Sequence, residues 1–255
     1  GTGLADAIVI DALTGGYETN PLFRRISLTF PKGAFIALAG PNGSGKSSLL
    51  KFLYKQLKPE EGTIWVEQAD LATLKQKALA QNIGFVPQNG RLDFSFTVEE
   101  TVAMGRYANP QKDDAKRIYR AMETCSILNL RNTPVTRISG GELQRTFLAR
   151  ALAQDGRILL LDEPVNHLDV AHQRSVMHLL RNLVAQGYTV IAVLHDLLLA
   201  QAYSSWIVFL KEGAVAAEGP TGEVVNEAVL QSVYNVESYR IRDPYLGKEL
   251  LIPVW

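Results

Sequence analysis

The stretch that decides the fold reads Gly40-Pro41-Asn42-Gly43-Ser44-Gly45-Lys46-Ser47-Ser48. An apolar segment, Phe35–Ala39, precedes it and predicts a β-strand, and a helix is predicted to begin near Lys46. The glycines allow the backbone to turn tightly enough to aim several N–H groups inward, and the helix adds its positive dipole end. A glycine-rich turn that binds nothing is the alternative. The context favours a nucleotide site in which Lys46 reaches the β- and γ-phosphates and Ser47 ligates Mg²⁺.

A second motif places two acids at the end of an apolar run, Ile158–Leu161 followed by Asp162 and Glu163. Such a run is typical of a buried parallel strand whose C-terminal end delivers carboxylates. Asp162 suits Mg²⁺, directly or through water. Glu163 suits a general base that orients and deprotonates an attacking water, a role worth roughly 10² to 10⁴ in rate. The pair could instead form a helix-capping turn before Pro164, but the phosphate loop favours the catalytic interpretation.

A third stretch, Ile138-Ser139-Gly140-Gly141-Glu142-Leu143-Gln144-Arg145, narrows the class of nucleotide-binding protein. A Ser-Gly-Gly string alone is also a common N-cap and turn. Here it follows a helical region and precedes the acidic strand, and in that order it resembles the signature of the ABC ATPases. In that family the Ser and Gly backbone groups at a helix start form a second anion site. The resemblance assigns this role to Ser139, Gly140, Gly141 and Glu142.

Further residues match the ABC pattern in the family's order, over roughly residues 6–220. Tyr17 resembles the aromatic residue that stacks on adenine, and Gln88 resembles the glutamine that contacts Mg²⁺ and water. Asp169 ends a segment resembling the one that crosses the dimer interface, and His195 resembles the histidine that touches the γ-phosphate. Taken alone, Tyr17 would be a core or surface residue and His195 a capping or packed one. The resemblance implies four catalytic residues, Glu163, His195, Gln88 and Lys46.

The bulk composition is that of an ordinary globular protein. Of 255 residues, 47% are hydrophobic and 20% charged, with 26 basic residues against 26 acidic ones. This balance argues against nucleic acid as the main ligand, because proteins bind the phosphate backbone of nucleic acids through an excess of Lys and Arg. The longest apolar stretches, such as Thr189–Leu194 and Trp206–Leu210, fall far below the roughly 20 residues needed to cross a bilayer. The single cysteine, Cys125, cannot form an internal disulfide, which favours a reducing compartment.

Strand and helix signals divide the chain into regions. The first third alternates short strands with turns, with a helix signal over Ala72–Ala80. Residues 89–155 show apolar positions at helical spacing, and strands alternate with helices again from residue 156. Together with the resemblance, this predicts an α/β P-loop NTPase fold with a RecA-like core and an antiparallel β subdomain in 1–88 and 156–220. Residues 89–155 would form an inserted α-helical subdomain. The C-terminal tail, 221–255, shows weaker order signals and is assigned no chemistry.

The family resemblance also implies a head-to-tail homodimer. Because the signature site cannot fold back onto its own phosphate loop, each ATP is expected between Lys46 of one chain and Ser139, Gly140 and Gly141 of a second copy. A unit charge pair near 4 Å is worth about 4 kcal/mol at an effective dielectric near 20, so loss of the γ-phosphate is expected to reopen the interface. ATP binding would close the dimer and hydrolysis would open it.

The segment after Gln88 and residues 166–173 resemble the importers of iron chelates, haem and cobalamin, and closely their manganese and zinc relatives, although Val165 replaces the usual threonine. The resemblance implies a peripheral ATPase on the cytoplasmic face of the inner membrane. It would work with two integral membrane permease subunits and indirectly with a substrate-binding protein. The apolar positions of this segment could instead be core of the helical lobe: Phe94, Phe96, Val98 and Val102.

Three other functions remain open from the sequence. A manganese or zinc importer ATPase differs from a chelate importer only in cargo, which the permease and the binding protein recognise. A soluble ABC ATPase acting in translation or on DNA usually carries two cassettes or long coiled coils, and no sustained heptad is present. A module that uses ATP only as a structural ligand would fit a degraded site, whereas Lys46, Asp162, Glu163 and His195 are intact.

Overall fold

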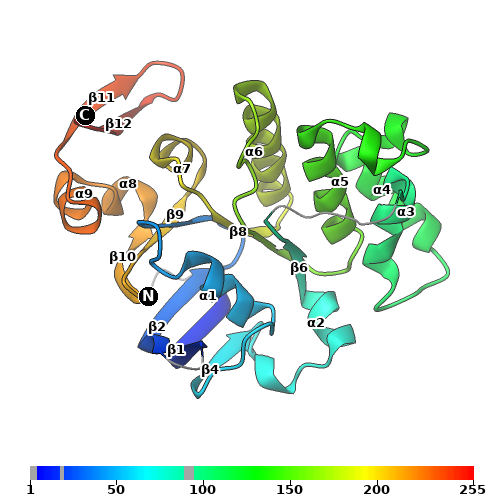
Figure 1. Cartoon of the computed structure of the whole chain (residues 1–255), viewed down its shortest axis with the longest axis horizontal. Coiled ribbons are helices and arrows are strands. Elements are labelled where there is room, and N and C mark those ends of the chain that lie inside the picture. Colours follow the sequence, from blue (N-terminus) through cyan, green and yellow to red (C-terminus); the bar gives the residue numbers. More distant parts are fainter. Residues whose placement is uncertain (1–4, 18–19, 89–94) are drawn as a thin grey trace. The chain divides into compact units, whose positions relative to one another are not determined.

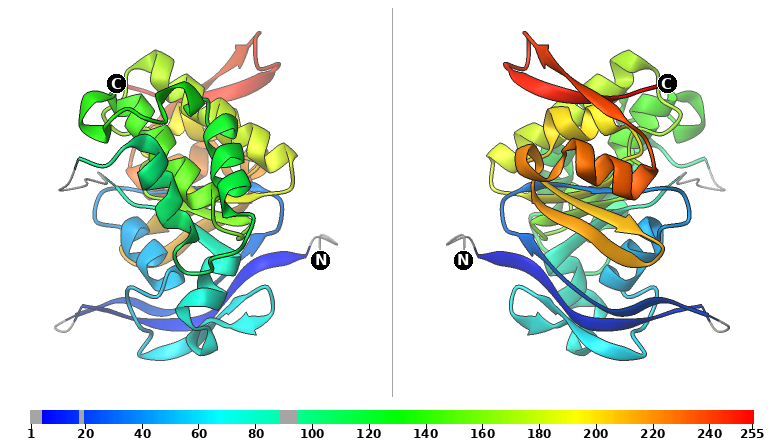
Figure 2. Two further views of the ribbon diagram at one scale, coloured as in Figure 1. Left: turned by 90° about the vertical axis from the view of Figure 1, so that its right-hand side faces the viewer. Right: turned by 90° about the vertical axis from the view of Figure 1, so that its left-hand side faces the viewer.

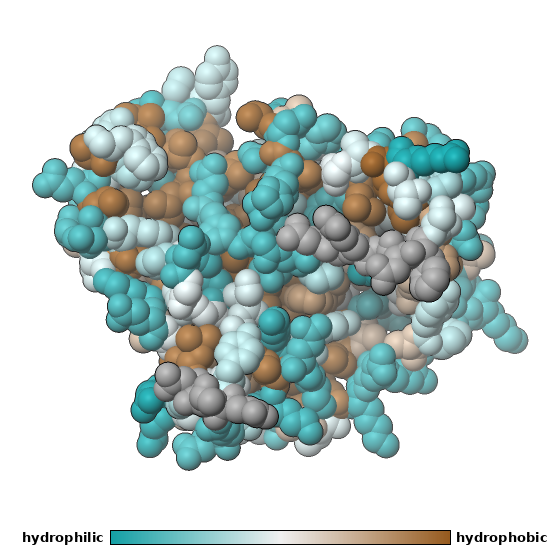
Figure 3. Space-filling view, in the orientation of Figure 1, coloured by the Kyte–Doolittle hydropathy of each residue, from teal (hydrophilic) through white to brown (hydrophobic). Residues whose placement is uncertain are grey.

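The computed structural model describes residues 5–17, 20–88 and 95–255, and these form two compact units. The first unit comprises Gly1–Ala72 and Thr189–Trp255, and the second comprises Thr73–Tyr188. The subdomain boundaries expected from the sequence stay a prediction. No helix within the described ranges is long and apolar enough to span a bilayer. Hydrophilic and hydrophobic side chains are interspersed over the face of the molecule seen in Figure 3.

The first unit contains the antiparallel sheet that the sequence predicts. Its strands run in the order β2-β1-β4-β5 (Figure 1). Along β1 the apolar residues Ala7, Ile8, Ile10 and Leu13 are buried, so that this strand contributes to the core. The strand bounds are β1 (Asp6–Tyr17), β2 (Asn20–Pro31), β4 (Glu61–Val66) and β5 (Ala69–Asp70).

A second group of strands in the same unit runs β10-β9-β3-β8. Strands β9, β3 and β8 pair in parallel, whereas β9 and β10 form an antiparallel hairpin. Every residue of β3 and β8 is buried, as expected for parallel strands covered on both faces. A helix follows each of these two strands. The bounds are β3 (Phe35–Ala39), α1 (Lys46–Leu53), β8 (Thr189–Val193), α7 (Leu197–Tyr203), β9 (Trp206–Lys211) and β10 (Ala214–Pro220).

The C-terminal tail is better ordered than its sequence suggests, which corrects the expectation of weak structure. It forms α8 (Thr221–Val224), α9 (Glu227–Tyr234) and a hairpin of β11 (Ser238–Asp243) and β12 (Lys248–Pro253). The hairpin lies against α7 and α9 (Figure 2). Gln201 on α7 binds the backbone of Leu251 in both directions, at 3.0 and 2.8 Å. Arg240 makes a two-bond ion pair with Glu227, at 2.6 and 3.1 Å. These partners lie too far apart in sequence to leave a local signal.

The second unit pairs β6 (Ile83–Val86) in parallel with β7 (Ile158–Leu161) and carries the helices predicted between them. Two of the helices begin with a capping box, in which Thr97 precedes α3 and Ser139 precedes α5. Each hydroxyl accepts the backbone N–H of a glutamate three residues later, and the carboxylate of that glutamate accepts the backbone N–H of the capping residue. The helices are α2 (Gln76–Asn82), α3 (Val98–Ala103), α4 (Asp114–Thr124), α5 (Gly140–Leu152) and α6 (Val170–Ala185), with 3₁₀ turns η2 (Met104–Arg106), η3 (Leu128–Leu130) and η4 (Val135–Arg137).

The prediction of a helix over Ala72–Ala80 is wrong about where the helix begins. The chain instead forms a 3₁₀ turn, η1 (Leu71–Thr73), and the helix begins only at Gln76. The Ala72 N–H donates to the Asp70 carboxylate at 3.0 Å, and such a bond favours a turn over a helix. Lys75 then adopts an extended conformation as the N-cap of α2.

Candidate functional site

The phosphate loop of the first unit connects β3 to α1, as the sequence predicts, and its glycines are required by their surroundings. Gly40 has a φ of 141°, and a Cβ there would lie 2.1 Å from the carbonyl oxygen of Leu210. Gly45 has a φ of 106°, and its Cβ would meet the Phe23 ring at 2.8 Å. A side chain at either position would have to push apart strands or aromatic packing, so the close backbone approach depends on glycine.

Two polar groups within this loop fit an anionic phosphate. The Lys46 side chain is only 5% exposed, and its Nζ donates to the carbonyl oxygens of Gly40 and, at 3.1 Å, of Pro41. The hydroxyl of Ser44 is buried without a hydrogen-bond partner. A buried orphan hydroxyl is unfavourable unless a ligand satisfies it. Together with the helix N-terminus of α1, the buried cation and the orphan donor fit a nucleotide phosphate. Ser47 and Ser48, in the first turn of α1, are half-buried.

The C-terminal tail contacts this loop, which the sequence analysis missed. The Gly40 N–H donates to the hydroxyl of Tyr234 on α9, and the ring of Tyr234 packs edge-on against Phe209 with centroids 6.0 Å apart. Burial raises the pKa of Tyr234 to about 12, although the hydrogen bond from Gly40 by itself lowers this pKa. Gly40 is therefore held between Tyr234 and the Leu210 carbonyl of β9. No local pattern marks Tyr234, because its partner lies at the other end of the chain.

The remaining predicted residues of the first unit lie at exposed ends of elements. Tyr17 ends β1 with its side chain 53% exposed, and its hydroxyl is 3.4 Å from the Ser48 Oγ. The hydrogen bond with Ser48, and then the charge of Lys51, lower the pKa of the Tyr17 phenol. His195 is exposed between β8 and α7, where Asp196 caps the helix by accepting the Leu198 N–H at 2.8 Å. An exposed ring suits adenine stacking for Tyr17, and the cap fixes the backbone beside His195; both roles stay predictions.

In the second unit, the two acids follow β7 as predicted. Asp162 is 8% exposed, and its N–H donates to the carbonyl oxygen of Val86 on the neighbouring strand β6 at 3.0 Å. Glu163 has a φ of 52°, a conformation that is costly for a residue with a side chain and is found where function requires it. Its Oε2 accepts bonds from Gln88 Nε2 at 2.5 Å and from Asn166 Nδ2 at 3.1 Å. The structure thus brings Gln88 and Glu163 together, and it adds Asn166, to which the sequence analysis gave no role of its own.

The signature stretch forms the N-terminus of α5. The Glu142 N–H donates to Ser139 Oγ at 3.1 Å, and the Ser139 N–H donates to Glu142 Oε1 at 2.9 Å. The Ser139 N–H lowers the pKa of Glu142, because the bond favours the charged carboxylate. Ser139 and Gly140 are exposed, whereas Gly141 is buried. An exposed helix start with glycine in its first turn leaves backbone N–H groups accessible to an anion.

A histidine missed by the sequence analysis packs on this helix start. A Cβ on Gly141 would lie 2.3 Å from the ring of His172. Asp169, the N-cap of α6, accepts the His172 N–H at 2.9 Å and contacts His172 Nδ1 at 2.7 Å. These two bonds, the backbone one first, lower the pKa of Asp169. Asp169 therefore orients His172, and His172 requires a glycine at position 141. The signal was present in the sequence as a histidine three residues after a helix-capping Asp.

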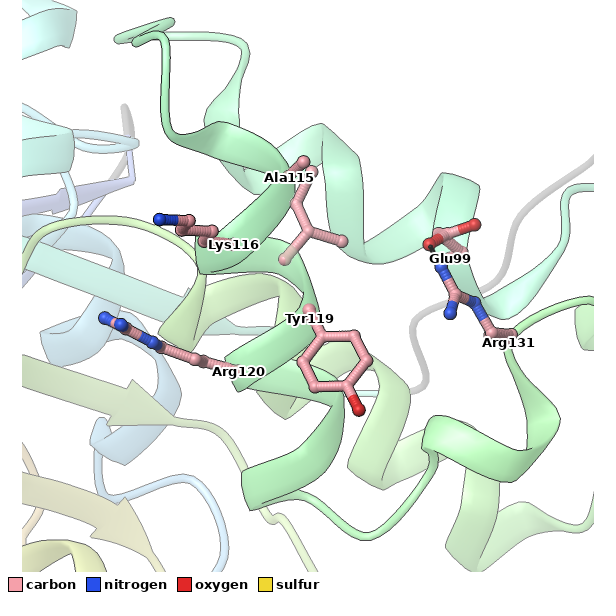
Figure 4. Close-up of a pocket in the computed structure, with 7 residues that line it drawn as sticks. Glu99, Ala115, Lys116, Tyr119, Arg120 and Arg131 are labelled. Atoms are coloured by element: carbon pink, nitrogen blue, oxygen red, sulfur yellow. Dashed lines mark hydrogen bonds and ion pairs between the residues drawn. The ribbon is translucent and has the colours of Figure 1, made fainter.

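A groove of about 500 Å³ lies between α3 and α4 in the second unit (Figure 4). Arg131 binds Glu99 at 2.5 Å and lies 6.0 Å from the centroid of the Tyr119 ring. Glu99 of this groove belongs to the segment after Gln88 that resembles the importers, of which residues 89–94 lie outside the described part of the chain. The alternative interpretation holds for Val98 and Val102 in that segment, which are fully buried in the helical core, whereas Phe96 is only half-buried and Phe94 lies outside the described residues. The lining residues are Glu99, Ala115, Lys116, Ile118, Tyr119, Arg120 and Arg131.

Comparisons with known proteins agree with this geometry. A family model described as ABC transporter matches residues 23–166. The ferric enterobactin transport ATP-binding protein FepC of Escherichia coli K12 is 36% identical over 251 residues, which cover 96% of this chain and 93% of that protein. The hemin import ATP-binding protein HmuV of Rhodococcus jostii RHA1 is 40% identical over 237 residues, covering 91% and 81%. A solved inward-facing transporter assigned to the metal-chelate type has a TM-score of 0.84 at 28% identity, covering 98% of both chains.

Proposed function

The chain belongs to the ABC transporter family, and from this premise we propose that it is the ATP-hydrolysing subunit of an importer of metal chelates. The observation that carries the proposal is the phosphate loop, in which buried Lys46 and the orphan hydroxyl of Ser44 fit a phosphate. Both relatives named above are ATP-binding proteins of iron-chelate transport, one for ferric enterobactin and one for hemin. Their cargoes differ, so the likeness supports a class of iron or related metal chelate, such as a siderophore complex, haem or cobalamin.

ATP binding is assigned to loop residues Gly40 to Ser48, with Tyr17 stacking on adenine. Lys46 would exchange its bonds to Gly40 and Pro41 for the β- and γ-phosphate oxygens. Ser47, Gln88 and Asp162 carry the oxygen atoms that Mg²⁺ prefers, and they are the residues we assign to hold it. Bound Mg²⁺ would neutralise charge that develops on the phosphates as the terminal bond breaks.

Hydrolysis is assigned to Glu163 as general base. Its carboxylate would orient a water and accept its proton as the water oxygen bonds to the γ-phosphorus and the bond to the β–γ bridging oxygen breaks. His195 would contact the γ-phosphate and stabilise the charge on its oxygens. Gln88 would contact the water while its amide binds Glu163, so that it connects the base to the helical region.

A head-to-tail homodimer completes the proposal. The exposed start of α5, with Ser139, Gly140, Gly141 and Glu142, is suited to receive the γ-phosphate of ATP held by a second copy. Asp169 belongs to the turn before α6 that would face the partner. ATP would then hold the two copies together, and its hydrolysis would release them.

The groove between α3 and α4 is the surface we assign to a permease. It combines the apolar faces of Ala115, Ile118 and Tyr119 with cationic rims, a composition suited to a short amphipathic segment of a membrane subunit. Two such integral membrane subunits would each contact one ATPase, at the cytoplasmic face of the inner membrane. A substrate-binding protein would act only through those subunits.

The test is ATP turnover by the purified chain, alone and after reconstitution with the integral membrane proteins that co-purify from its host. Stimulation by those proteins is expected, and Glu163→Gln should abolish turnover and trap an ATP-bound dimer that sizing chromatography detects. Tyr119→Ala should reduce the stimulation and spare basal turnover, whereas Tyr239→Ala should change neither. Tyr239 is a tyrosine of the C-terminal hairpin with a comparable exposed fraction, 50% against 42% for Tyr119. Turnover that no membrane protein stimulates, or a monomer in the presence of ATP, would contradict the proposal.

A further inference from the structure

We propose that Asn166 is a positioning residue for ATP hydrolysis, acting through Glu163. The inference rests on the proposed function, because it takes Glu163 as the general base. Asn166 is exposed on the turn that connects β7 to α6, and its side-chain amide binds the Glu163 carboxylate. Its contribution is to hold the base in one orientation.

The direction of the Asn166 bond is fixed by chemistry. A carboxylate can only accept hydrogen bonds, so the amide nitrogen, and not the amide oxygen, must face Glu163. Nδ2 lies 3.1 Å from Glu163 Oε2. The same residue closes the turn through its backbone, because the Asn166 N–H donates to the Glu163 carbonyl oxygen at 3.2 Å. Backbone and side chain therefore bind the same glutamate.

A second amide approaches the same oxygen from another element. Gln88 follows β6, which pairs with β7 in parallel, and its Nε2 lies 2.5 Å from Glu163 Oε2. Two donors on one oxygen, added to the covalent link through the side chain, fix the plane of the carboxylate. The two bonds differ in sequence separation. Asn166 is three residues from Glu163, in the same turn, whereas Gln88 is 75 residues away.

The backbone of this turn is strained in a way that a positioning role explains. Glu163 and His167 have φ values of 52° and 63°, both in the left-handed region that favours glycine. Such conformations persist only where surrounding bonds over-determine them, and they concentrate at functional sites. Asn166 lies between these two residues, and its paired bonds supply that constraint. A base held by its own turn is aligned before ATP arrives, so less ordering is needed in the transition state.

The inference predicts which kinetic constant changes. Loss of the Asn166 donor would leave ATP affinity intact and lower kcat by about ten- to a hundredfold, a fraction of what a general base contributes. The bond is exposed, so its loss should hardly change resistance to urea. A residue with only a structural role would show the reverse pattern.

The experiment compares Asn166→Ala, Asn166→Asp and the control Asn182→Ala in the full chain. Asn182 is an exposed asparagine of α6 in the same unit. We measure kcat and KM for ATP, ATP affinity by titration calorimetry, and the urea midpoint. Asn166→Ala should lower kcat with KM, affinity and midpoint unchanged. Asn166→Asp keeps the shape but replaces the donor with a charge that repels Glu163, so its kcat should fall further. Asn182→Ala should match the wild type.

Each alternative outcome has a distinct meaning. A wild-type kcat in Asn166→Ala overturns the inference, as does a loss that comes with a raised KM or a lower urea midpoint. An Asn166→Asp variant more active than Asn166→Ala also overturns it, because shape and not donation would then matter. A wild-type chain without turnover, or one unaffected by Glu163→Gln, is instead the failure of the proposed function.

Discussion

Two adjacent glycines at the start of α5 should respond in opposite ways to the same substitution. Gly140→Ala and Gly141→Ala each replace a glycine in the first turn of a helix, which by propensity alone favours folding by up to about 1 kcal/mol. At Gly140 the nearest atom to an added Cβ is a Leu168 methyl at 3.6 Å, an ordinary contact. At Gly141 the added Cβ would lie 2.3 Å from Cδ2 and 2.7 Å from Cγ of His172. The imidazole must move away.

The expected magnitude follows from that collision. Forcing a methyl into a packed position costs about 1–3 kcal/mol, and moving His172 also sacrifices its 2.7 Å bond to Asp169. Because the propensity gain is common to both variants, their difference in unfolding free energy should be about 1–3 kcal/mol, with Gly140→Ala the more stable. Urea unfolding followed by circular dichroism measures it. A second background, His172→Ala, removes the ring. In that background, Gly141→Ala should have the same unfolding free energy as Gly140→Ala.

The pair also separates stability from function. Gly140 is exposed on the helix start that we assign to the partner's γ-phosphate, so a methyl there should lower ATP turnover in a chain that is no less stable than the wild type. Equal unfolding free energies for the two variants would refute the steric argument. So would a cost of Gly141→Ala that persists without His172, because the collision with the imidazole would then not be its cause.

Three further outcomes are expected. Tyr234→Phe should lower the unfolding free energy by about 1 kcal/mol in urea titrations, because the buried Gly40 N–H loses its acceptor; an unchanged value would contradict this. Arg106→Ala should cost about 2–4 kcal/mol by the same measurement, since the guanidinium is 3% exposed and its loss leaves the buried carbonyl oxygens of Ala153 and Asn109 without their donor. Glu142 has a depressed pKa in the folded state owing to the Ser139 N–H, so its stabilisation is present above its ordinary pKa of 4.5 and is lost as pH falls through the folded value. Glu142→Gln retains the capping box without titrating; its stability relative to the wild type should therefore rise below about pH 4.5, and a pH-independent difference would count against that bond.

The sequence determined the parts of this protein that short spacings encode. The phosphate loop, the acidic pair after β7 and the capped start of α5 each need a few residue types at fixed offsets, because backbone geometry over eight or fewer residues sets the chemistry. A short apolar run located a buried strand for the same reason, and Phe35–Ala39 is predicted with the bounds that the structure has. The helix near residue 72 was predicted to start too early because Asp70 competes for the backbone through a local bond.

Tertiary structure decided which distant groups meet. Gln88 reaches Glu163 across 75 residues because β6 and β7 are neighbours, and Asn166 joins them only when the turn after β7 adopts its left-handed conformation. The structure of the C-terminal tail could not be predicted from the sequence, because it depends on hydrogen bonds such as that between Gln201 and Leu251, 50 residues apart, and on the burial of Tyr234 beside Gly40. A local pattern states what a segment can do, but a hydrogen bond between segments exists only after the chain has brought both partners together.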